Sequence, residues 1–294
     1  QGRLDHSAWL GCSQCEDAEE VMNALQYDQF DWLVVDHYSL DLEWEEIISN
    51  RVGRILVIDD LADRRHSCNL LLDQNLGRTK EHYAGLLPEG AATLLGPRFA
   101  LLREEFMSLR CESLKRRSAG LIKHVLVSMG GVDSLNYTCK VLNALARERS
   151  FSGFTITVVM GAKAPHLPAV RAAAGGANGN IRVLTDVQNM AELLLSCDLA
   201  IGAPGSSSWE RCCMGVPSLI VPTAENQLFI AEQLVRSGAA LQIKEEIKEG
   251  STRLKMNLGK VRSEALARLS NAASEVTDGM GVQRVVSQLL NWEE

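Results

Sequence analysis

Short runs of β-branched and aliphatic residues alternate along the chain with amphipathic stretches of helical period, and this alternation limits the fold most. Near the start, runs at 32–35 and 54–58 flank an amphipathic stretch at 42–48. The order strand, helix, strand is typical of a βαβ unit, whose two strands are parallel. The sequence therefore predicts an α/β fold with parallel sheets.

The alternation is present twice. Runs at 70–72 and 92–95 complete a first group, and a second group has runs at 124–128, 155–160, 181–184, 199–201, 218–221 and 240–243, followed by amphipathic stretches at 258–276 and 282–292. A chain of 294 residues with 46% apolar content can bury two cores. We expect two Rossmann-like domains, 1–117 and 118–294, joined at Ser118-Ala119-Gly120, with the last helix able to cross back to the first domain.

Charge and composition exclude several classes of partner. The net charge is −7 and the only basic cluster is Lys115-Arg116-Arg117, so no nucleic-acid partner is expected. No apolar run approaches the roughly 20 residues of a membrane span, and no secretory signal is present. Most of the eight cysteines lie in apolar segments, which indicates reduced thiols. We expect a cytoplasmic protein without a membrane partner, and the oligomeric state stays open.

The exception among the cysteines is the C-x-x-C pair Cys12 and Cys15. Such a pair serves as half a zinc site or as a redox dithiol in some proteins, but zinc needs two more ligands at partner spacing. None stands near, so we interpret the pair as a chance spacing.

The segment from Gly202 to Glu210, GAPGSSSWE, follows a predicted strand and opens a predicted helix. Glycines there let backbone N–H groups approach a phosphate, and serines add donors. The alternative is that the serines only cap a helix. The sequence favours a phosphate site whose candidate residues are Gly205, Ser206, Ser207, Ser208 and Glu210. A carboxylate would repel a diphosphate, so we expect Glu210 to hold ribose hydroxyls; the alternative is that it only complements the helix dipole.

Two more strand-to-helix turns are expected at the same edge of that sheet. One contains Gly130 and Gly131, with Asn136 in the helix expected at 134–146 that follows, although a Gly-Gly pair alone suits any tight turn. The other contains Asn226 and Gln227, whose amides suit sugar hydroxyls or acetamido groups. Helix capping is an equally good interpretation of Asn226.

In the first domain, Asp36-His37-Tyr38 ends a predicted strand. Adjacent strand residues point to opposite faces, so we do not expect His37 to act together with both of its neighbours. Tyr38 is the better ligand candidate, and His37 is more simply structural. Acidic residues and one histidine at 59, 60, 63, 66 and 73 could suggest a divalent metal, but their spacing matches no known loop. We expect solvated strand ends and hydrogen bonds to the loop backbone there, no metal site and no cofactor.

Six segments together resemble one family: VVDHYSLDLEWE (34–45), VIDDLADRRHSCNLLLDQN (57–75), GPRFALLREEF (96–106), SMGGVD (128–133), GAPGSSSWERCCMGVPSLIVPTAENQ (202–227) and DGMGVQRV (278–285). They resemble the UDP-2,4-diacetamido-2,4,6-trideoxy-β-L-altropyranose hydrolases of bacterial pseudaminic acid biosynthesis. That family is similar in fold to the GT-B glycosyltransferases such as MurG. The resemblance implies that Tyr38 and Asn226 line the reaction centre and that residues from Asn136 to Cys139 lie against the ligand. It also implies that Glu210 takes the ribose and that the serines around Ser207 take the diphosphate.

One part of the family pattern is absent from this sequence. Family members begin with a strand and a G-x-G-H turn whose histidine is the expected general base, and none of the six histidines here follows such a turn. We therefore expect a first domain that lacks its N-terminal strand, helix and strand, and we assign no catalytic histidine. The favoured function is hydrolysis of the UDP-linked sugar to free sugar and UDP. The alternatives are a GT-B UDP-sugar glycosyltransferase, or a non-catalytic UDP-sugar-binding protein if the chain truly starts at Gln1.

Overall fold

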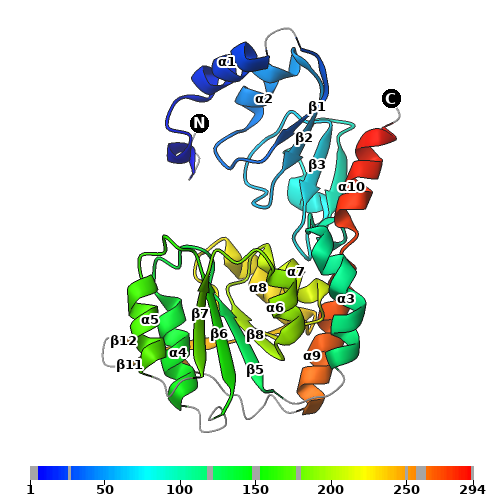
Figure 1. Ribbon diagram of the computed structural model, residues 1–294. Coiled ribbons are helices and arrows are strands. Elements are labelled where there is room, and N and C mark those ends of the chain that lie inside the picture. The colour runs from blue at the N-terminus through cyan, green and yellow to red at the C-terminus, as the bar shows by residue number, and fades with distance from the viewer. Residues whose placement is uncertain are drawn as a thin grey trace. The chain divides into compact units, whose positions relative to one another are not determined.

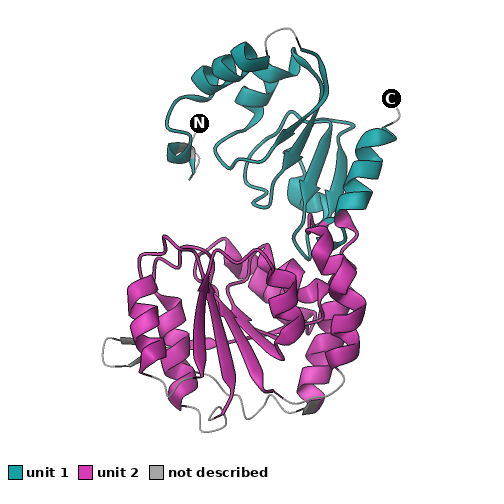
Figure 2. Ribbon diagram, viewed as in Figure 1, with its two compact units in different colours: residues 1–99, 282–294 teal, residues 100–281 magenta. Residues whose placement is uncertain are grey.

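The computed structural model describes residues 6–25, 28–117, 122–147, 153–176, 180–248, 251–255 and 263–292. The chain forms two compact units, shown in Figure 2: unit 1 comprises 1–99 and 282–294, and unit 2 comprises 100–281. The sequence placed the boundary at 117/118, whereas helix α3 (Glu104–Arg116) groups with unit 2. Ser113 of α3 donates to the carbonyl of Met214, which explains this grouping. The linker expected at 118–120 lies outside the described residues.

Unit 1 is built on a four-stranded parallel sheet in the order β1-β2-β3-β4 (Figure 1). Its strands are β1 (Phe30–Val35), β2 (Val52–Ile58), β3 (Leu70–Asp73) and β4 (Ala92–Leu95). Its helices are α1 (Gln14–Leu25), α2 (Leu42–Ser49) and α10 (Gly281–Leu290), with short 3-10 turns at Ser7–Trp9, Lys80–Tyr83 and Pro97–Phe99.

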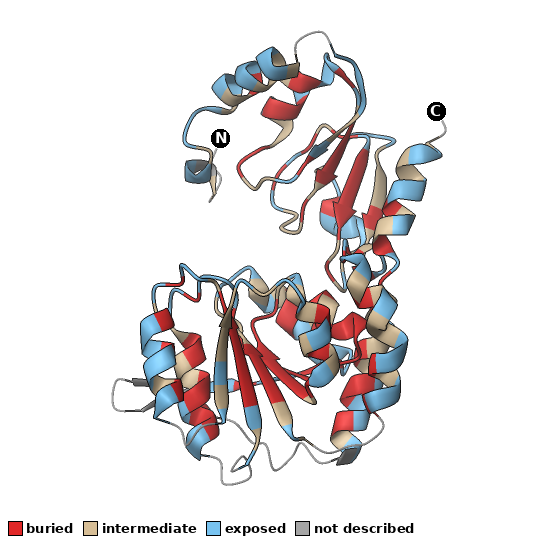
Figure 3. Ribbon diagram, viewed as in Figure 1, coloured by how far each residue is buried: buried red, intermediate tan, exposed pale blue. Residues whose placement is uncertain are grey.

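The strands of unit 1 alternate between two apolar layers. Ile55 and Val57 of β2 pack with residues of α1 and α2 on one face of the sheet. Leu56 of β2, with Leu70 and Leu72 of β3, packs on the other face against Val285 of α10. Both faces are covered, so residues 55–57 of β2 and all of β3 are buried, as Figure 3 shows.

Unit 2 contains a six-stranded parallel sheet in the order β10-β9-β8-β5-β6-β7. The strands are β5 (His124–Ser128), β6 (Thr155–Met160), β7 (Ile181–Thr185), β8 (Leu199–Gly202), β9 (Ser218–Ile220) and β10 (Ala240–Gln242). The helices besides α3 are α4 (Tyr137–Arg147), α5 (Leu167–Gly175), α6 (Met190–Ser196), α7 (Ser207–Cys213), α8 (Gln227–Arg236) and α9 (Ser263–Val276). Val125, Val127 and Val158 pack against α4 and α5 in the main core of this unit.

The two parallel sheets confirm the predicted fold class, and each predicted strand is present within two residues of its expected bounds. Two details differ. The predicted helix at 134–146 begins at Tyr137. The antiparallel pair β11 (Lys244–Lys248) and β12 (Ser251–Lys255) was not predicted. Across the part of the chain that the structure describes, no helix has the length and apolarity needed to cross a membrane.

Candidate functional site

In the sheet of unit 2, the direction in which the chain adds successive strands reverses between β5 and β8. From β5 the chain proceeds outward to β6 and β7, and β8 then pairs with the other edge of β5 and leads to β9 and β10. Ligands of open α/β sheets bind at the carboxyl ends of the strands beside such a switch point. Ser128 at the end of β5 pairs with Gly202 at the end of β8, so the two predicted glycine turns leave from adjacent positions.

A side chain at Gly202 would not fit at this point. A Cβ there would lie 2.6 Å from the carbonyl oxygen of Ser128 and 2.9 Å from Nη1 of Arg211. Glycine therefore allows the close approach of the two strand ends and leaves room for a guanidinium.

The turn after β8 leads directly into α7. The amide of Ser208 donates to the carbonyl of Gly205 at 2.8 Å, and the amide of Trp209 donates to that of Ser206 at 3.0 Å. Ser206 makes no side-chain cap bond and is exposed, so the alternative interpretation of this serine as a helix cap is wrong. Gly205 and Ser207 are half-buried, whereas Ser208 is only 1% exposed. Of the three predicted serines, Ser206 and Ser207 reach the surface of the turn.

Arg211, one helical turn after the serines, was not among the predicted residues. It is 5% exposed. Its Nη1 donates to Oγ of Ser207 at 3.2 Å, and Nη2 donates to Oγ of Ser208 at 2.9 Å and to the carbonyl of Ala203 at 3.0 Å. Burial lowers the pKa of the guanidinium, but arginine stays charged in proteins. The turn thus has a buried positive charge behind it.

Glu210 lies in the first turn of α7 and is half-buried. Burial raises the pKa of its carboxyl group, and the positive charges of Arg211 and Arg103 oppose that rise. A small cavity of about 20 Å³ is lined by Glu210, Ser207 and Ser128, among other residues. The carboxylate therefore borders the same space as the serine turn.

The turn after β5 is held open by unusual backbone conformations. Gly130 has φ +96°, and Asp133 and Asn136 have φ 44° and 53°. The carboxylate of Asp133 accepts from the amides of Tyr137 and Thr138, both at 2.8 Å, and so caps α4. This cap explains why the helix begins at Tyr137 rather than at Ser134.

The predicted residues of this turn differ in exposure. Gly130 and Gly131 are exposed, and no atom lies within 4 Å of a Cβ built on either of them. Asn136 and Cys139 are half-buried, and Oδ1 of Asn136 accepts from the amide of Cys139 at 3.4 Å. Burial raises the pKa of the Cys139 thiol, which disfavours a nucleophilic role.

Asn226 and Gln227 follow β9 at the start of α8. Asn226 occupies the N-cap position, but its side chain makes no cap bond and is exposed. Oε1 of Gln227 accepts from the amide and the hydroxyl of Thr223, at 2.8 and 3.2 Å. The Asn226 amide thus remains at the surface, while the carbonyl oxygen of Gln227 is committed to the loop.

In unit 1, Tyr38 follows β1 and is half-buried. Its ring lies 5.2 Å from the ring of His6 and 5.9 Å from that of Trp9. Burial and the negative charge of neighbouring Asp60 raise the pKa of the phenol. Burial also raises the pKa of Asp60. Tyr38 is therefore a neutral hydroxyl beside a carboxylate.

The expectation of solvated acidic strand ends is wrong for Asp59 and Asp73, which are 1% and 0% exposed. The expected hydrogen bonds to the loop backbone are present: Asp59 accepts from the amide of Ala62 at 2.9 Å, and Asp73 from the amide of Asn75 at 2.8 Å. Asp59 pairs with Nη1 of Arg64 at 2.7 Å, and this charge holds the pKa of Asp59 below its usual value despite burial. Asp73 lies 2.8 Å from Nε of Arg78, and burial raises its pKa to about 7. The hydroxyl of Tyr83 lies between the two carboxylates, at 3.1 and 2.9 Å. These groups therefore form a structural network.

Two histidines of unit 1 have structural partners. Nδ1 of His37 accepts from the amide of Ser39 at 3.1 Å. Nδ1 of His66 lies 2.7 Å from Oε1 of Glu45, and both side chains are fully buried. Within the described ranges, no three histidine, cysteine or acidic side chains are grouped as metal ligands would be.

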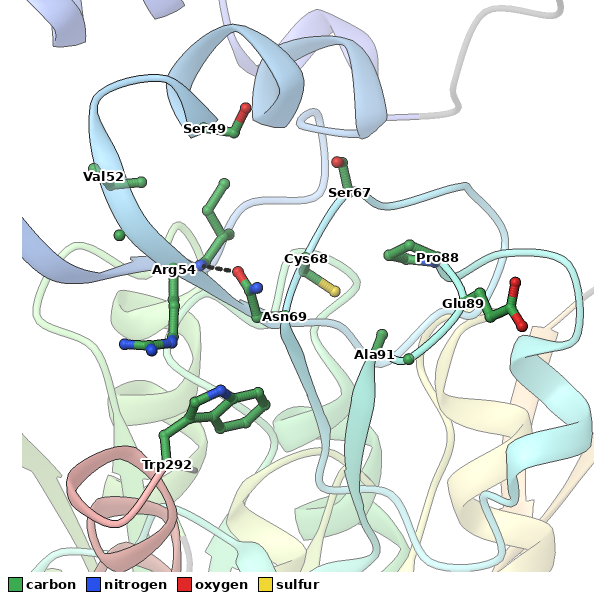
Figure 4. Close-up of a pocket in the computed structure, with 13 residues that line it drawn as sticks. Ser49, Val52, Arg54, Ser67, Cys68, Asn69, Pro88, Glu89, Ala91 and Trp292 are labelled. Carbon is green, nitrogen blue, oxygen red and sulfur yellow. Dashed lines mark hydrogen bonds between the residues drawn. The ribbon is translucent and has the colours of Figure 1, made fainter. Parts of the chain in front are cut away.

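Unit 1 also has a cavity of about 380 Å³, shown in Figure 4. Its lining includes Arg54, Asn69, Ala91 and Trp292. These residues lie at the amino ends of β2, β3 and β4 or at the end of the chain, whereas Tyr38 follows the carboxyl end of β1. The cavity is therefore separate from the predicted site residues of this unit.

Comparison with known proteins identifies a family. Residues 124–289 match the glycosyltransferase family 28 C-terminal domain. The UDP-2,4-diacetamido-2,4,6-trideoxy-beta-L-altropyranose hydrolase of Campylobacter jejuni is 26% identical over 78% of this chain and 80% of its own length. The spore coat polysaccharide biosynthesis protein SpsG of Bacillus subtilis is 28% identical over 66% of this chain and 57% of its own length. Thus the chain resembles the hydrolase family recognised in its sequence.

The fold is also known from solved structures. MurG of Acinetobacter baumannii has a TM-score of 0.60 and 15% identity, and the match covers 94% of this chain and 76% of that one. At this identity the likeness concerns the fold alone.

Proposed function

Because the chain belongs to the glycosyltransferase family 28 C-terminal domain family, we propose that it hydrolyses a UDP-linked 2,4-diacetamido-2,4,6-trideoxy sugar to UDP and the free sugar. The observation that carries the proposal is the adjacency of the Gly130-Gly131 turn and the glycine-serine turn at the switch point of unit 2. The similarity to the Campylobacter hydrolase supports the choice of reaction and sugar.

In this proposal, unit 2 binds the nucleotide. Gly205, Ser206 and Ser207 offer amides and hydroxyls to the diphosphate. Buried Ser208 contributes by accepting a hydrogen bond from Arg211. Glu210, half-buried in the first turn of α7, accepts hydrogen bonds from the ribose hydroxyls.

The other predicted residues of unit 2 bind around the nucleotide and the sugar. Gly130 and Gly131 leave open space at the end of β5, so a ligand can approach the backbone there. Asn136 and Cys139 lie along the same turn, at the start of α4.

Hydrolysis needs groups that act on the sugar as well. A bond forms between the water oxygen and the anomeric carbon, the bond from that carbon to the diphosphate oxygen breaks with its electron pair going to UDP, and the proton that the water loses passes to solvent. We propose that Tyr38 and Asn226 contact the reacting sugar, and that Gln227 orients it through its amide nitrogen. Tyr38 acts as a neutral hydrogen-bond donor, since its phenol pKa is raised. Donors aimed at the departing diphosphate lower the barrier to its release.

The second candidate is transfer of the sugar to an acceptor, which the glycosyltransferase family itself favours. The third is a UDP-sugar-binding protein without turnover. All three share the nucleotide site of unit 2 and differ only in what happens to the sugar.

Product analysis separates the three functions. The purified chain is incubated with the UDP-linked diacetamido sugar, with and without candidate acceptors, and the products are identified by mass spectrometry and NMR. Release of UDP and free sugar without acceptor is the expected result. UDP release only when an acceptor is present would identify a transferase, and binding without release would identify a binding protein.

A further inference from the structure

Arg211 is a buried cation of unit 2 that has no carboxylate partner among the described residues. Among the described residues, its Nη atoms donate to the two serine hydroxyls and the Ala203 carbonyl, and its buried Nε has no partner. A buried charge is unfavourable unless something offsets it. The nearby Glu210 carboxylate favours the charged guanidinium, but among the described residues it forms no ion pair with it. The charge lies directly behind a turn that is itself at the surface.

The direction of these hydrogen bonds determines how the serines can act. A guanidinium only donates, so Oγ of Ser207 accepts from Arg211 and keeps its own proton for another acceptor. Ser207 is half-buried and stands beside exposed Ser206. The proton of Ser207 is therefore available to an anion on the outer side of the turn.

The space for this guanidinium is built into the fold. Gly202 leaves room for Nη1, since a Cβ there would lie 2.9 Å from it. The third contact of the guanidinium, with the carbonyl of Ala203, fixes it to the backbone of the turn. A larger residue in place of Gly202 would displace Nη1 of Arg211, and a smaller residue in place of Arg211 would remove it. Either change would disturb the hydrogen bond from Nη1 to Ser207.

We propose that Arg211 is the positioning residue of the phosphate site, which holds Ser207 as a hydrogen-bond donor and supplies the positive charge that a diphosphate requires. This inference rests on the proposed function, because the anion is the diphosphate of the UDP-sugar. Arg211 acts through Ser207 and through its charge, without touching the ligand.

Calorimetric titration of UDP and of uridine, which lacks phosphate, tests the role. Arg211→Met should weaken UDP binding about ten-fold or more and leave uridine binding unchanged. Arg117→Met is the matched control, because Arg117 is also a buried arginine of unit 2 with an unpartnered Nε, bonded to the carbonyls of Cys197 and Leu194. That variant should keep both affinities.

The outcomes separate the two proposals. UDP binding by Arg211→Met within two-fold of the unchanged protein would overturn the role of Arg211 and leave the proposed function intact. If the unchanged protein binds neither UDP nor uridine, the proposed function fails, and the role of Arg211 fails with it.

A second experiment decides the matter if Arg211→Met does not fold. Arg211→Lys keeps the positive charge, but an ammonium group cannot hold two hydroxyls with the planar geometry of a guanidinium. In a double-mutant cycle, Ser207→Ala should cost clearly less UDP affinity in the Arg211→Lys background than in the unchanged protein. Additive losses would show that Arg211 does not act through Ser207.

Discussion

Glu210 shows how one residue can be interpreted in two ways that a substitution separates. It lies in the first turn of α7, where a carboxylate complements the helix dipole, and it borders the same space as Ser207. The dipole interpretation concerns stability alone, whereas the ribose interpretation concerns UDP affinity. The two make different predictions for the same variant.

Glu210→Ala should weaken UDP binding about ten-fold or more, because hydrogen bonds to a charged group contribute roughly 1.5–3 kcal/mol. Calorimetry measures the change. Glu264→Ala serves as the control, since Glu264 is an exposed carboxylate in the first turn of α9 in the same unit. Unchanged UDP affinity in Glu210→Ala would leave only the dipole role.

Tyr38→Phe should lower turnover of the UDP-sugar at least about ten-fold while UDP affinity stays the same, because the phenol acts on the sugar. Steady-state kinetics and UDP titration give the two values. Tyr83→Phe is the matched control: its hydroxyl contacts buried Asp59 and Asp73, so its loss should reduce stability and spare turnover. A loss of UDP affinity without loss of turnover in Tyr38→Phe would place Tyr38 in the nucleotide site instead.

For single residues, the sequence predicts the structure where neighbours along the chain determine it. It does not predict burial that depends on partners distant in the sequence. Asp59 and Asp73 look like solvated strand ends in the sequence, but Arg64 and Arg78 fold back onto them. Arg211 carries a weak signal, its spacing of three and four residues from the serines, which places the side chains on one face of a helix. That the guanidinium is buried behind the turn follows only from the packed structure.

At the scale of elements, the strands were predictable because buried parallel strands are continuous apolar runs. The pair β11 and β12 was missed because its sequence, KEEIKEGSTRLK over 244–255, is charged and lacks an apolar face of either period. The start of α4 was misplaced by three residues because the positive φ of Asn136 and the cap by Asp133 are not visible as a pattern. The bounds of helices that follow irregular turns are therefore harder to predict from sequence than the bounds of buried strands.

The loops of unit 2 also depend on contacts between elements. The amide of Gly161, after β6, donates to the carbonyl of Gly131 at 3.0 Å, and a Cβ on Gly161 would lie 2.5 Å from that carbonyl oxygen. Gly161→Ala should therefore displace the Gly131 turn and destabilise the protein by about 1–3 kcal/mol. UDP binding should weaken as well, because that turn borders the proposed site.

Denaturant unfolding and UDP titration measure both effects of Gly161→Ala. Gly175→Ala is the control, since Gly175 ends α5 and nothing lies within 4 Å of its Cβ position. Equal stability of the two variants would contradict the argument that the β6 turn supports the β5 turn.

At the scale of the whole molecule, unit 1 is discontinuous in sequence, because unit 2 lies between its two segments. Unit 1 consists of residues 1–99 and 282–294, and unit 2 consists of the residues between them, 100–281. In unit 1, α10 covers the apolar face that Leu70 and Leu72 present. The C-terminal helix is therefore part of the core of unit 1 although it follows unit 2 in sequence.

This division of the chain allows the nucleotide and the sugar to be assigned separately. The proposed diphosphate and ribose contacts all belong to unit 2, whereas Tyr38 belongs to unit 1. Hydrogen exchange read by mass spectrometry should therefore respond differently to UDP and to the intact UDP-sugar. UDP alone should protect peptides that cover 128–132 and 202–210, because ligand binding suppresses local opening.

The intact UDP-sugar, added to a slow Tyr38→Phe variant, should extend this protection to the peptide that contains 36–40, since the sugar is proposed to reach that position. Uridine alone supplies the control for nucleoside contacts without phosphate. Protection of 36–40 by UDP alone, as strong as that of 202–210, would instead mean that the nucleotide itself binds unit 1. The sugar would then have to be assigned to other residues, and the proposed division of roles between the units would be wrong.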